Sequence, residues 1–242
     1  MTPHAKSAED SFRAGAPVQY RRIYLWHWAV RAMHWVSVLC ILTLIVTGTY
    51  IAHPYFTTSG EASAHYLMGD VRFVHFTAAG LLVATAMLRV YWLFIGNRFE
   101  RWSALLPYGK EDWKNMWLVI KRYLFIQPWR APHYLGHNPL EQATDSFMYL
   151  VAIVQILTGF YMFGLATPGG FFFTTFGWVG ALFGGAQSVR FWHHLLMWPW
   201  MVFIPVHVYM TVRADVVHQE SRISSMVGGG RYARADVEFI DD

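Results

Sequence analysis

One uncharged stretch, residues 191–212, reads FWHHLLMWPWMVFIPVHVYMTV and contains no Asp, Glu, Lys or Arg. About 20 apolar residues in a helix, at roughly 1.5 Å per residue, cross the ~30 Å hydrocarbon core of a bilayer. The stretch nevertheless carries His193 and His207, and ionisable side chains inside a membrane span are rare and point to function. It therefore predicts a transmembrane helix built around two functional histidines.

Three other parts of the chain show the same pattern. Residues 35–52, 73–88 and 147–166 are also free of Asp, Glu, Lys and Arg. With 55% hydrophobic and 14% charged residues, the 242-residue chain is too apolar for an ordinary soluble domain. We predict an all-α integral membrane four-helix bundle whose spans lie at about 31–52, 71–95, 144–166 and 190–213.

Lys and Arg are distributed unevenly between the segments that connect these spans. They gather before the first span, between the second and third, and after the fourth, whereas residues 53–70 and 167–188 contain none. By the positive-inside rule, both termini and the long middle loop face the cytoplasm. The membrane domain, 31–213, is then flanked by a cytoplasmic N-terminal segment, 1–30, and a cytoplasmic tail, 214–242. The net charge of +4 thus encodes orientation in the bacterial cytoplasmic (inner) membrane and indicates no nucleic-acid partner.

The segments outside the spans carry further expectations. Within 111–129, four apolar side chains recur at helical spacing, as in an amphipathic helix on the inner membrane surface: Trp113, Trp117, Ile120 and Leu124. The outer loop, 167–186, is rich in Gly and Phe and is expected to be partly buried or bound by a partner. The tail after 227, with glycines at 228–230, is expected to be mobile. The first twenty residues show no removable signal peptide.

The single cysteine, Cys40, lies inside the first predicted span. One cysteine cannot form an intrachain disulfide, hold an iron–sulfur cluster or provide the C-x-x-C-H attachment of c-type haem. Any haem in this chain is therefore bound noncovalently.

Four histidines lie within the predicted spans at two depths. His34, in the first span, and His207, in the fourth, lie toward the inner side. His75, in the second span, and His193, in the fourth, lie toward the outer side. Two imidazoles in one layer form the ligand set of a bis-histidine haem, whereas a zinc site needs three or four ligands in one place. A hydrogen-bonding role in the protein core is the alternative for each histidine taken alone.

The spacing within the fourth span supports the same assignment. His193 and His207 are 14 residues apart, which at about 100° per residue closes to within roughly 40° of whole turns and rises about 21 Å. His194 would be turned about 140° away from that face, so we select His193. Gly48 lies on the face of His34 at the depth of the outer pair. There it leaves room for a flat macrocycle, although small residues also serve ordinary helix packing.

Arginines precede three of these histidines by three residues. Residues i and i+3 share a helix face, so each guanidinium lies one turn closer to water than its imidazole. Two roles fit Arg31, Arg72 and Arg190: pairing with anionic haem propionates, or reaching the lipid headgroups. Arg89, deep in the second span, fits a propionate, a quinone carbonyl or the headgroups.

The chain resembles the b-type cytochrome subunit of membrane-bound nickel–iron hydrogenases, within the diheme cytochrome b group that also serves formate dehydrogenases. The resemblance covers about residues 30–232. It rests on the motifs Val30-Arg31-x-x-His34-Trp35, Val46-Thr47-Gly48, Met68-Gly69-x-x-Arg72-x-x-His75-Phe76, Arg89-x-Tyr91-Trp92, Gly96-Asn97-Arg98, Gly136-His137-Asn138-Pro139, Trp192-His193, His207-Val208-Tyr209-Met210 and Ile223-Ser224-x-Met226-Val227.

This resemblance implies two haem b groups, with His34 and His207 as axial ligands of the inner one and His75 and His193 of the outer one. It also implies a non-catalytic subunit that receives electrons from the hydrogenase small subunit, itself bound to the large subunit, and reduces membrane quinone. The chain would then belong to a hetero-oligomer in the lipid bilayer. Near the inner side, Arg89, Asp145 and Tyr209 are candidates for the quinone site. A formate dehydrogenase partner, or a haem-free membrane anchor or proton transporter, is the alternative.

Overall fold

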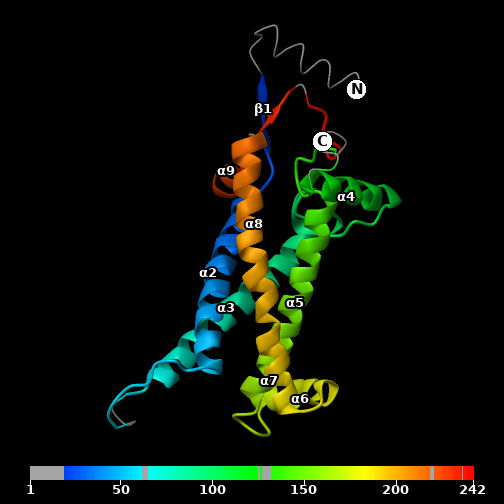
Figure 1. Cartoon of the computed structure of the whole chain (residues 1–242). Helices are drawn as coiled ribbons and strands as arrows, with labels where there is room; N and C mark the ends of the chain where they lie inside the picture. The colour runs from blue at the N-terminus through cyan, green and yellow to red at the C-terminus, as the bar shows by residue number, and fades with distance from the viewer. Residues whose placement is uncertain (1–18, 62–64, 125, 127–131, 219–220, 236) are drawn as a thin grey trace. The chain divides into compact units, whose positions relative to one another are not determined.

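A computed structural model describes residues 19–61, 65–124, 126, 132–218, 221–235 and 237–242 (Figure 1). The described part contains four helical stretches long and apolar enough to cross a membrane. They are α2 (Trp28–Ala52), α3 (Leu67–Ile95), α5 (Pro139–Gly164) and the combined stretch of α7 (Ala186–Leu195) and α8 (Met197–His218). The prediction of four spanning helices is confirmed.

The fourth stretch is not the single continuous helix that the spacing argument assumed. α7 ends at Leu195, and α8 begins at Met197 after the intervening Leu196. The physical reason is Pro199, which has no N–H to donate to the carbonyl of Leu195 and whose ring clashes with it. The angular relation between His193 and His207 is therefore not that of one regular helix.

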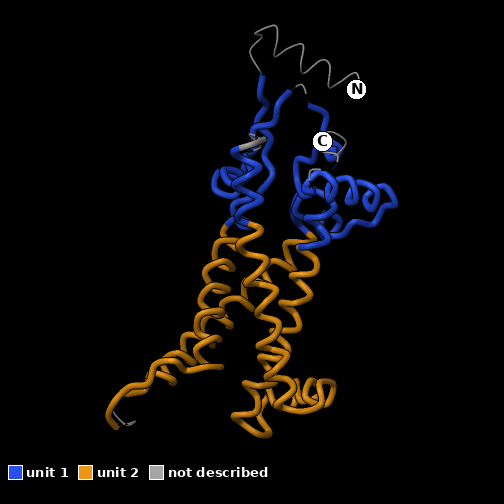
Figure 2. Tube along the Cα trace, in the orientation of Figure 1, with its two compact units in different colours: residues 1–31, 95–144, 208–242 blue, residues 32–94, 145–207 orange. Residues whose placement is uncertain are grey.

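The chain divides into two compact units, which are coloured separately in Figure 2. Unit 1 comprises residues 1–31, 95–144 and 208–242, and unit 2 comprises residues 32–94 and 145–207. Of the 19 Lys and Arg residues in the chain, unit 2 contains only Arg72, Arg89 and Arg190. The two units that the backbone contacts define therefore also differ in their content of basic residues.

Three side-chain contacts connect the long helices of unit 2. They join α2 to α3, α3 to α5 and α5 to α8 through the pairs Thr47–His75, Phe76–Phe163 and Gln155–Trp200. Hydrogen bonds and ring packing between side chains therefore link the four helical stretches within unit 2.

A further helix, α6 (Phe171–Phe183), occupies the segment predicted as a loop. Phe172 and Phe176 pack against Phe160 of α5, with ring centroids 5.2 and 4.9 Å apart. Gly180 is required there, because a Cβ at this position would lie 2.5 Å from the hydroxyl oxygen of Tyr161. The expectation of a partly buried segment agrees with the structure, since Val179 and Gly180 are buried.

Unit 1 contains a two-stranded antiparallel sheet, so the chain is not wholly α-helical. β1 (Tyr20–Tyr24) pairs with β2 (Gly230–Arg234), which follows the short helix α9 (Arg222–Gly228). Gly229 ends α9 with φ +80°, and its carbonyl accepts bonds from the amides of Leu25 and Trp26. The expectation of a mobile tail after 227 is wrong, because this paired strand holds the tail against the N-terminal segment.

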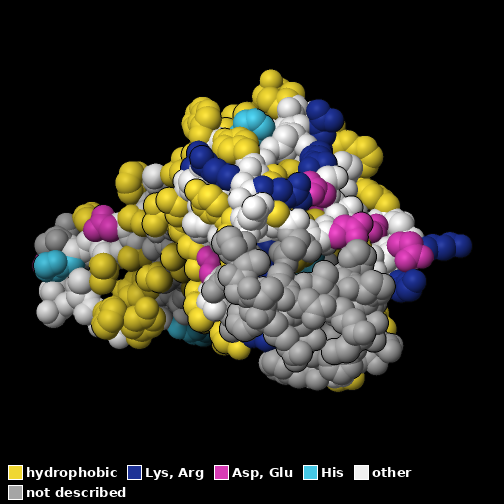
Figure 3. Space-filling view, turned by 90° about the horizontal axis from the view of Figure 1, so that it is seen from above, with side chains coloured by type: hydrophobic (Ala, Val, Ile, Leu, Met, Phe, Trp, Pro, Cys, Tyr) yellow, Lys and Arg dark blue, Asp and Glu magenta, His cyan; other side chains and the backbone are white. Residues whose placement is uncertain are grey.

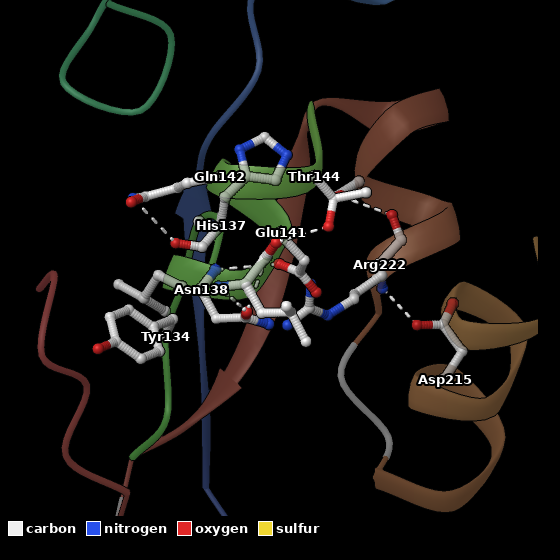
Figure 4. Close-up of polar contacts among 12 residues, drawn as sticks. Tyr134, His137, Asn138, Glu141, Gln142, Thr144, Asp215 and Arg222 are labelled. Carbon is white, nitrogen blue, oxygen red and sulfur yellow. Dashed lines mark hydrogen bonds and ion pairs between the residues drawn. The ribbon is translucent and has the colours of Figure 1, made fainter. Parts of the chain in front are cut away.

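The start of α5 and the start of α9 are joined by a polar cluster in unit 1 (Figure 4). The side-chain oxygen of Asn138 accepts bonds from the amides of Leu140 and Glu141, each at 3.0 Å. Glu141 accepts in return from the Asn138 amide and forms an ion pair with Arg222 at 2.7 Å. Asp215 accepts from the amides of Arg222 and Ile223. Asn138 thus serves as the N-cap of α5, and Glu141 completes a capping box.

The middle segment contains the short helix η2 (Trp102–Ala104) and helix α4 (Lys110–Tyr123). Trp113 and Trp117 on α4 are 58% and 57% exposed, although both are large and apolar. An amphipathic helix is therefore present where one was predicted, but residues 125 and 127–129 of the predicted range lie outside the described residues. So does most of the predicted N-terminal segment, residues 1–18. On the face of the molecule seen from above, Figure 3 shows Lys and Arg side chains beside Asp and Glu side chains.

A buried carboxylate, Glu100, joins the residues just before α2 to the residues just after α3 in unit 1. Glu100 is 0% exposed and accepts from the His27 amide at 2.5 Å, the His27 ring at 2.7 Å and the Asn97 amide at 3.2 Å. Asn97 also donates to the Leu25 carbonyl at 2.7 Å.

We expect Glu100→Ala to destabilise the protein by about 3 kcal/mol, because it removes a buried carboxylate that accepts hydrogen bonds from three donors. For a chain of this length the melting temperature should fall by roughly 5–10 °C. Thermal unfolding of the detergent-solubilised protein, followed by tryptophan fluorescence, measures the change. Glu111→Ala is the control, since Glu111 is exposed and its ion pair among the described residues is with the exposed Lys114, at 3.4 Å. Equal melting temperatures for both variants would contradict the role given to Glu100.

Candidate functional site

All four histidines predicted as ligands belong to unit 2. His34 lies on α2, His75 on α3, His193 on α7 and His207 on α8. The structure brings His34 close enough to His207, and His193 close enough to His75, for their charges to interact. These are the same two pairs that depth in the membrane predicts.

The imidazole of His75 lies against a threonine and a glycine of the neighbouring helix α2. The hydroxyl oxygen of Thr47 is 2.8 Å from His75 Nδ1, and the same hydroxyl donates to the Thr43 carbonyl at 2.7 Å. A Cβ on Gly48 would lie 3.4 Å from His75 Cε1. Gly48 therefore meets the ring of His75, at the depth that the sequence predicted for it.

His193 has the same surroundings, provided by α5. The hydroxyl oxygen of Thr158 is 2.8 Å from His193 Nδ1 and donates to the Val154 carbonyl at 2.7 Å. A Cβ on Gly159 would lie 3.4 Å from His193 Cε1. Thr158 is 0% exposed, so its hydroxyl has no access to water.

The surroundings of His34 and His207 differ from those of His75 and His193. His34 Nδ1 is buried and has no hydrogen-bond partner among the described residues. The His34 ring meets Trp35 edge-on at 5.1 Å, and the His207 ring stacks on Phe203 at 5.2 Å. His207 is largely exposed on α8.

His194 has a separate environment from His193. Its ring meets the ring of His53 edge-on, with the centroids 5.8 Å apart. The structure thus directs the two adjacent histidines to different neighbours, and only His193 carries the contacts to Thr158 and Gly159.

The arginines suggested as propionate partners occupy different positions. Arg72 and Arg190 are exposed, and Arg190 donates to the side chain of Gln187 at 3.4 Å. Arg31 belongs to unit 1 and donates to the carbonyl of Val227. Arg89 is partly exposed on α3. The suggested roles of these four arginines stay predictions, as does the grouping of Arg89 with Asp145 and Tyr209 near a quinone.

Three residues of the site have no predicted role: Thr47, Thr158 and Gly159. A Thr-Gly dipeptide occurs near the C-terminal end of two different spanning helices, at 47–48 in α2 and at 158–159 in α5. This repetition is the signal that would have found them. It is weak alone, because threonine in a helix commonly bonds only to the carbonyl four residues before it.

The two histidine pairs fit b-type haem better than they fit a bare metal ion. Among the described residues, no group of three or more His, Cys, Asp or Glu side chains could hold a metal ion. Haem needs only two axial ligands, because its macrocycle provides the other four. The glycines beside the rings of His75 and His193 are consistent with that ligand set.

Comparison with known proteins agrees with these features. Residues 25–229 match the family model described as prokaryotic cytochrome b561. A probable Ni/Fe-hydrogenase B-type cytochrome subunit of Azotobacter vinelandii is 43% identical over 219 residues, which cover 88% of this chain and 90% of that protein. Similar proteins with the same description are found in Cupriavidus necator (40% identical; 86% of each chain) and, as the hydrogenase 1 subunit, in Escherichia coli K12 (35% identical; 86% and 90%).

Since both the family model and these relatives cover most of its length, the chain belongs to the prokaryotic cytochrome b561 family, together with the B-type cytochrome subunits of nickel–iron hydrogenases.

Proposed function

We propose that this protein is the membrane cytochrome b subunit of a nickel–iron hydrogenase and passes electrons from the hydrogenase small subunit to the quinone pool. The family supports this role, and the curated relatives are named as such subunits. The protein is an electron carrier, and hydrogen oxidation takes place on its partner subunits. A single cysteine cannot build a nickel–iron site.

Two haem b groups are bound, one by His34 with His207 and one by His75 with His193. The observation that carries this proposal is the pairing within unit 2: His34 lies within electrostatic range of His207, and His193 lies within electrostatic range of His75. Bound haem supplies an iron that gains and loses one electron, and bis-histidine ligation leaves no open position for oxygen.

The remaining contributions come from the chain's own side chains. The four imidazoles hold the cofactors through one nitrogen each, and the helices fix the rings in two layers. Apolar side chains of the spans exclude water. Arg72, Arg190 and Arg31 are suited to balance carboxylate groups at the membrane surface, and Arg89 suits a propionate or a quinone.

Both termini and the middle segment face the cytoplasm in this proposal. Nearly all Lys and Arg residues belong to unit 1, which contains these parts of the chain. The segments between α2 and α3 and between α5 and α7 then face outward, where the hydrogenase small subunit binds. Helix α4, with its exposed tryptophans, lies on the inner surface.

Haem stoichiometry tests the ligand assignment. We expect two haem b per purified chain by the pyridine haemochromogen assay, and one in each of the variants His34→Ala, His75→Ala, His193→Ala and His207→Ala. Losing one axial ligand leaves the other layer intact. His194→Ala is the matched control and should retain two, because His194 lies against His53.

A purified protein without b-type bands in its reduced-minus-oxidised spectrum would overturn the cytochrome proposal and favour a haem-free anchor or proton transporter. Co-purification with formate dehydrogenase subunits in place of hydrogenase subunits would overturn only the partner.

Cysteine labelling tests the orientation. Cys40 is 4% exposed and lies within a span, so it should react little with the reagent. A single cysteine introduced at an exposed position should therefore account for the labelling. We expect Thr57→Cys to react with a membrane-impermeant maleimide in spheroplasts. Lys114→Cys on α4 should react only after the membrane is opened. The reverse pattern would contradict the proposed topology.

A further inference from the structure

We propose that Thr47 and Thr158 are positioning residues that fix the protonation and orientation of His75 and His193 and lower the midpoint potential of the haem that these two histidines hold. The inference rests on the haem ligation proposed above and adds to it a role for two residues that are not themselves ligands.

The direction of each hydrogen bond follows from the threonine. A hydroxyl has one proton to donate, and Thr47 places it toward the Thr43 carbonyl at 2.7 Å, while Thr158 places it toward the Val154 carbonyl at 2.7 Å. The hydroxyl oxygen is then an acceptor for the histidine ring at 2.8 Å. Nδ1 of the imidazole is therefore the protonated nitrogen.

The tautomer decides which nitrogen is available to iron. A neutral imidazole carries one N–H, so a proton on Nδ1 leaves the lone pair on Nε2. Nε2 is the far nitrogen of the ring and points away from the threonine. Both histidines thus keep the Nε2 lone pair for ligation.

The glycine after each threonine completes the arrangement. Gly48 and Gly159 lie beside Cε1, the ring carbon next to Nδ1, at a distance of 3.4 Å for a Cβ built on either glycine. A Cβ there would already touch the ring at van der Waals distance, so a side chain larger than alanine would crowd it. Each ring therefore has a threonine hydroxyl at Nδ1 and a glycine at Cε1. Helix α2 provides them for His75, and helix α5 provides them for His193.

The bond also affects the iron. An imidazole that donates a hydrogen bond from its second nitrogen becomes a more basic ligand, which favours the more highly charged oxidised iron. The structure gives this donor bond to both His75 and His193. It provides no such partner for His34 Nδ1 among the described residues. Removing the threonine hydroxyl should therefore alter one haem and leave the other unchanged.

Redox titration of the purified cytochrome tests the inference. Thr47→Val and Thr158→Val keep the side-chain shape and remove the acceptor. We expect each to shift the ferric–ferrous equilibrium of one haem about tenfold toward the reduced form. For a one-electron couple, this is a rise of about 59 mV in midpoint potential. The highest g value of the same ferric haem should move in the electron paramagnetic resonance spectrum, and the second haem should change in neither measurement.

Two controls separate this role from ordinary packing. Thr85→Val makes the same change in a buried threonine of α3 whose hydroxyl donates to the Leu81 carbonyl at 2.8 Å, and it should leave both potentials unchanged. Thr47→Ser restores the hydroxyl and should restore the wild-type potential.

The outcomes distinguish this inference from the proposed function. Two haems with unchanged potentials and g values in Thr47→Val and Thr158→Val would overturn the threonine role and leave the cytochrome assignment standing. Loss of one haem in Thr47→Val supports the role if Thr47→Ser retains both haems, and overturns it if Thr47→Ser loses the same haem. Wild-type protein without haem would overturn both proposals.

Discussion

The structure depends on satisfying both nitrogens of an imidazole inside a bilayer. Hydrocarbon offers no water, so a polar ring atom there needs a partner from the protein or from a ligand. His75 and His193 meet half of this requirement through the hydroxyls of Thr47 and Thr158 at 2.8 Å. The other nitrogen of each ring is the one that the proposed haem iron would bind. Iron ligation would therefore satisfy the nitrogen of His75 and of His193 that the threonine does not contact.

The division of the chain follows from the same constraint. Charged residues are expensive in hydrocarbon, and unit 2 accordingly contains only three Lys or Arg residues. Unit 1 contains the remaining basic residues, the capping box of Asn138 and Glu141, and the short sheet that joins β1 to β2. Hydrogen bonds and ion pairs organise unit 1, whereas unit 2 relies on long apolar helices joined by a few large side chains. One chain thus combines two kinds of stabilisation suited to two solvents.

Local pattern predicted the parts of the structure that the bilayer enforces. Long uncharged runs predicted the four spanning stretches, whereas the assignment of the four histidines as haem ligands stays a prediction. Two short strands from opposite ends of the chain carry no such pattern, since five residues such as Tyr20–Tyr24 are too few for a periodic signal. α6 was missed because its Gly and Phe residues show no polar face. The break at Leu196 was missed because the long apolar run suggested one continuous helix. Pro199, which disrupts the turn before it, is the residue that indicates the break.

The Thr-Gly dipeptides show why adjacent residues, and not residues three or four apart, build the seat of each ring. Successive side chains on a helix are about 100° apart, so they diverge and reach two points side by side across the neighbouring helix. Nδ1 and Cε1 are bonded neighbours on the imidazole, but their requirements differ. Nδ1–H needs a hydrogen-bond acceptor, whereas Cε1–H needs only space. Thr47 with Gly48 meets both needs for His75, and Thr158 with Gly159 does so for His193. A threonine alone would bond to the nitrogen without making space for the ring edge, and a glycine alone would make space without setting the proton.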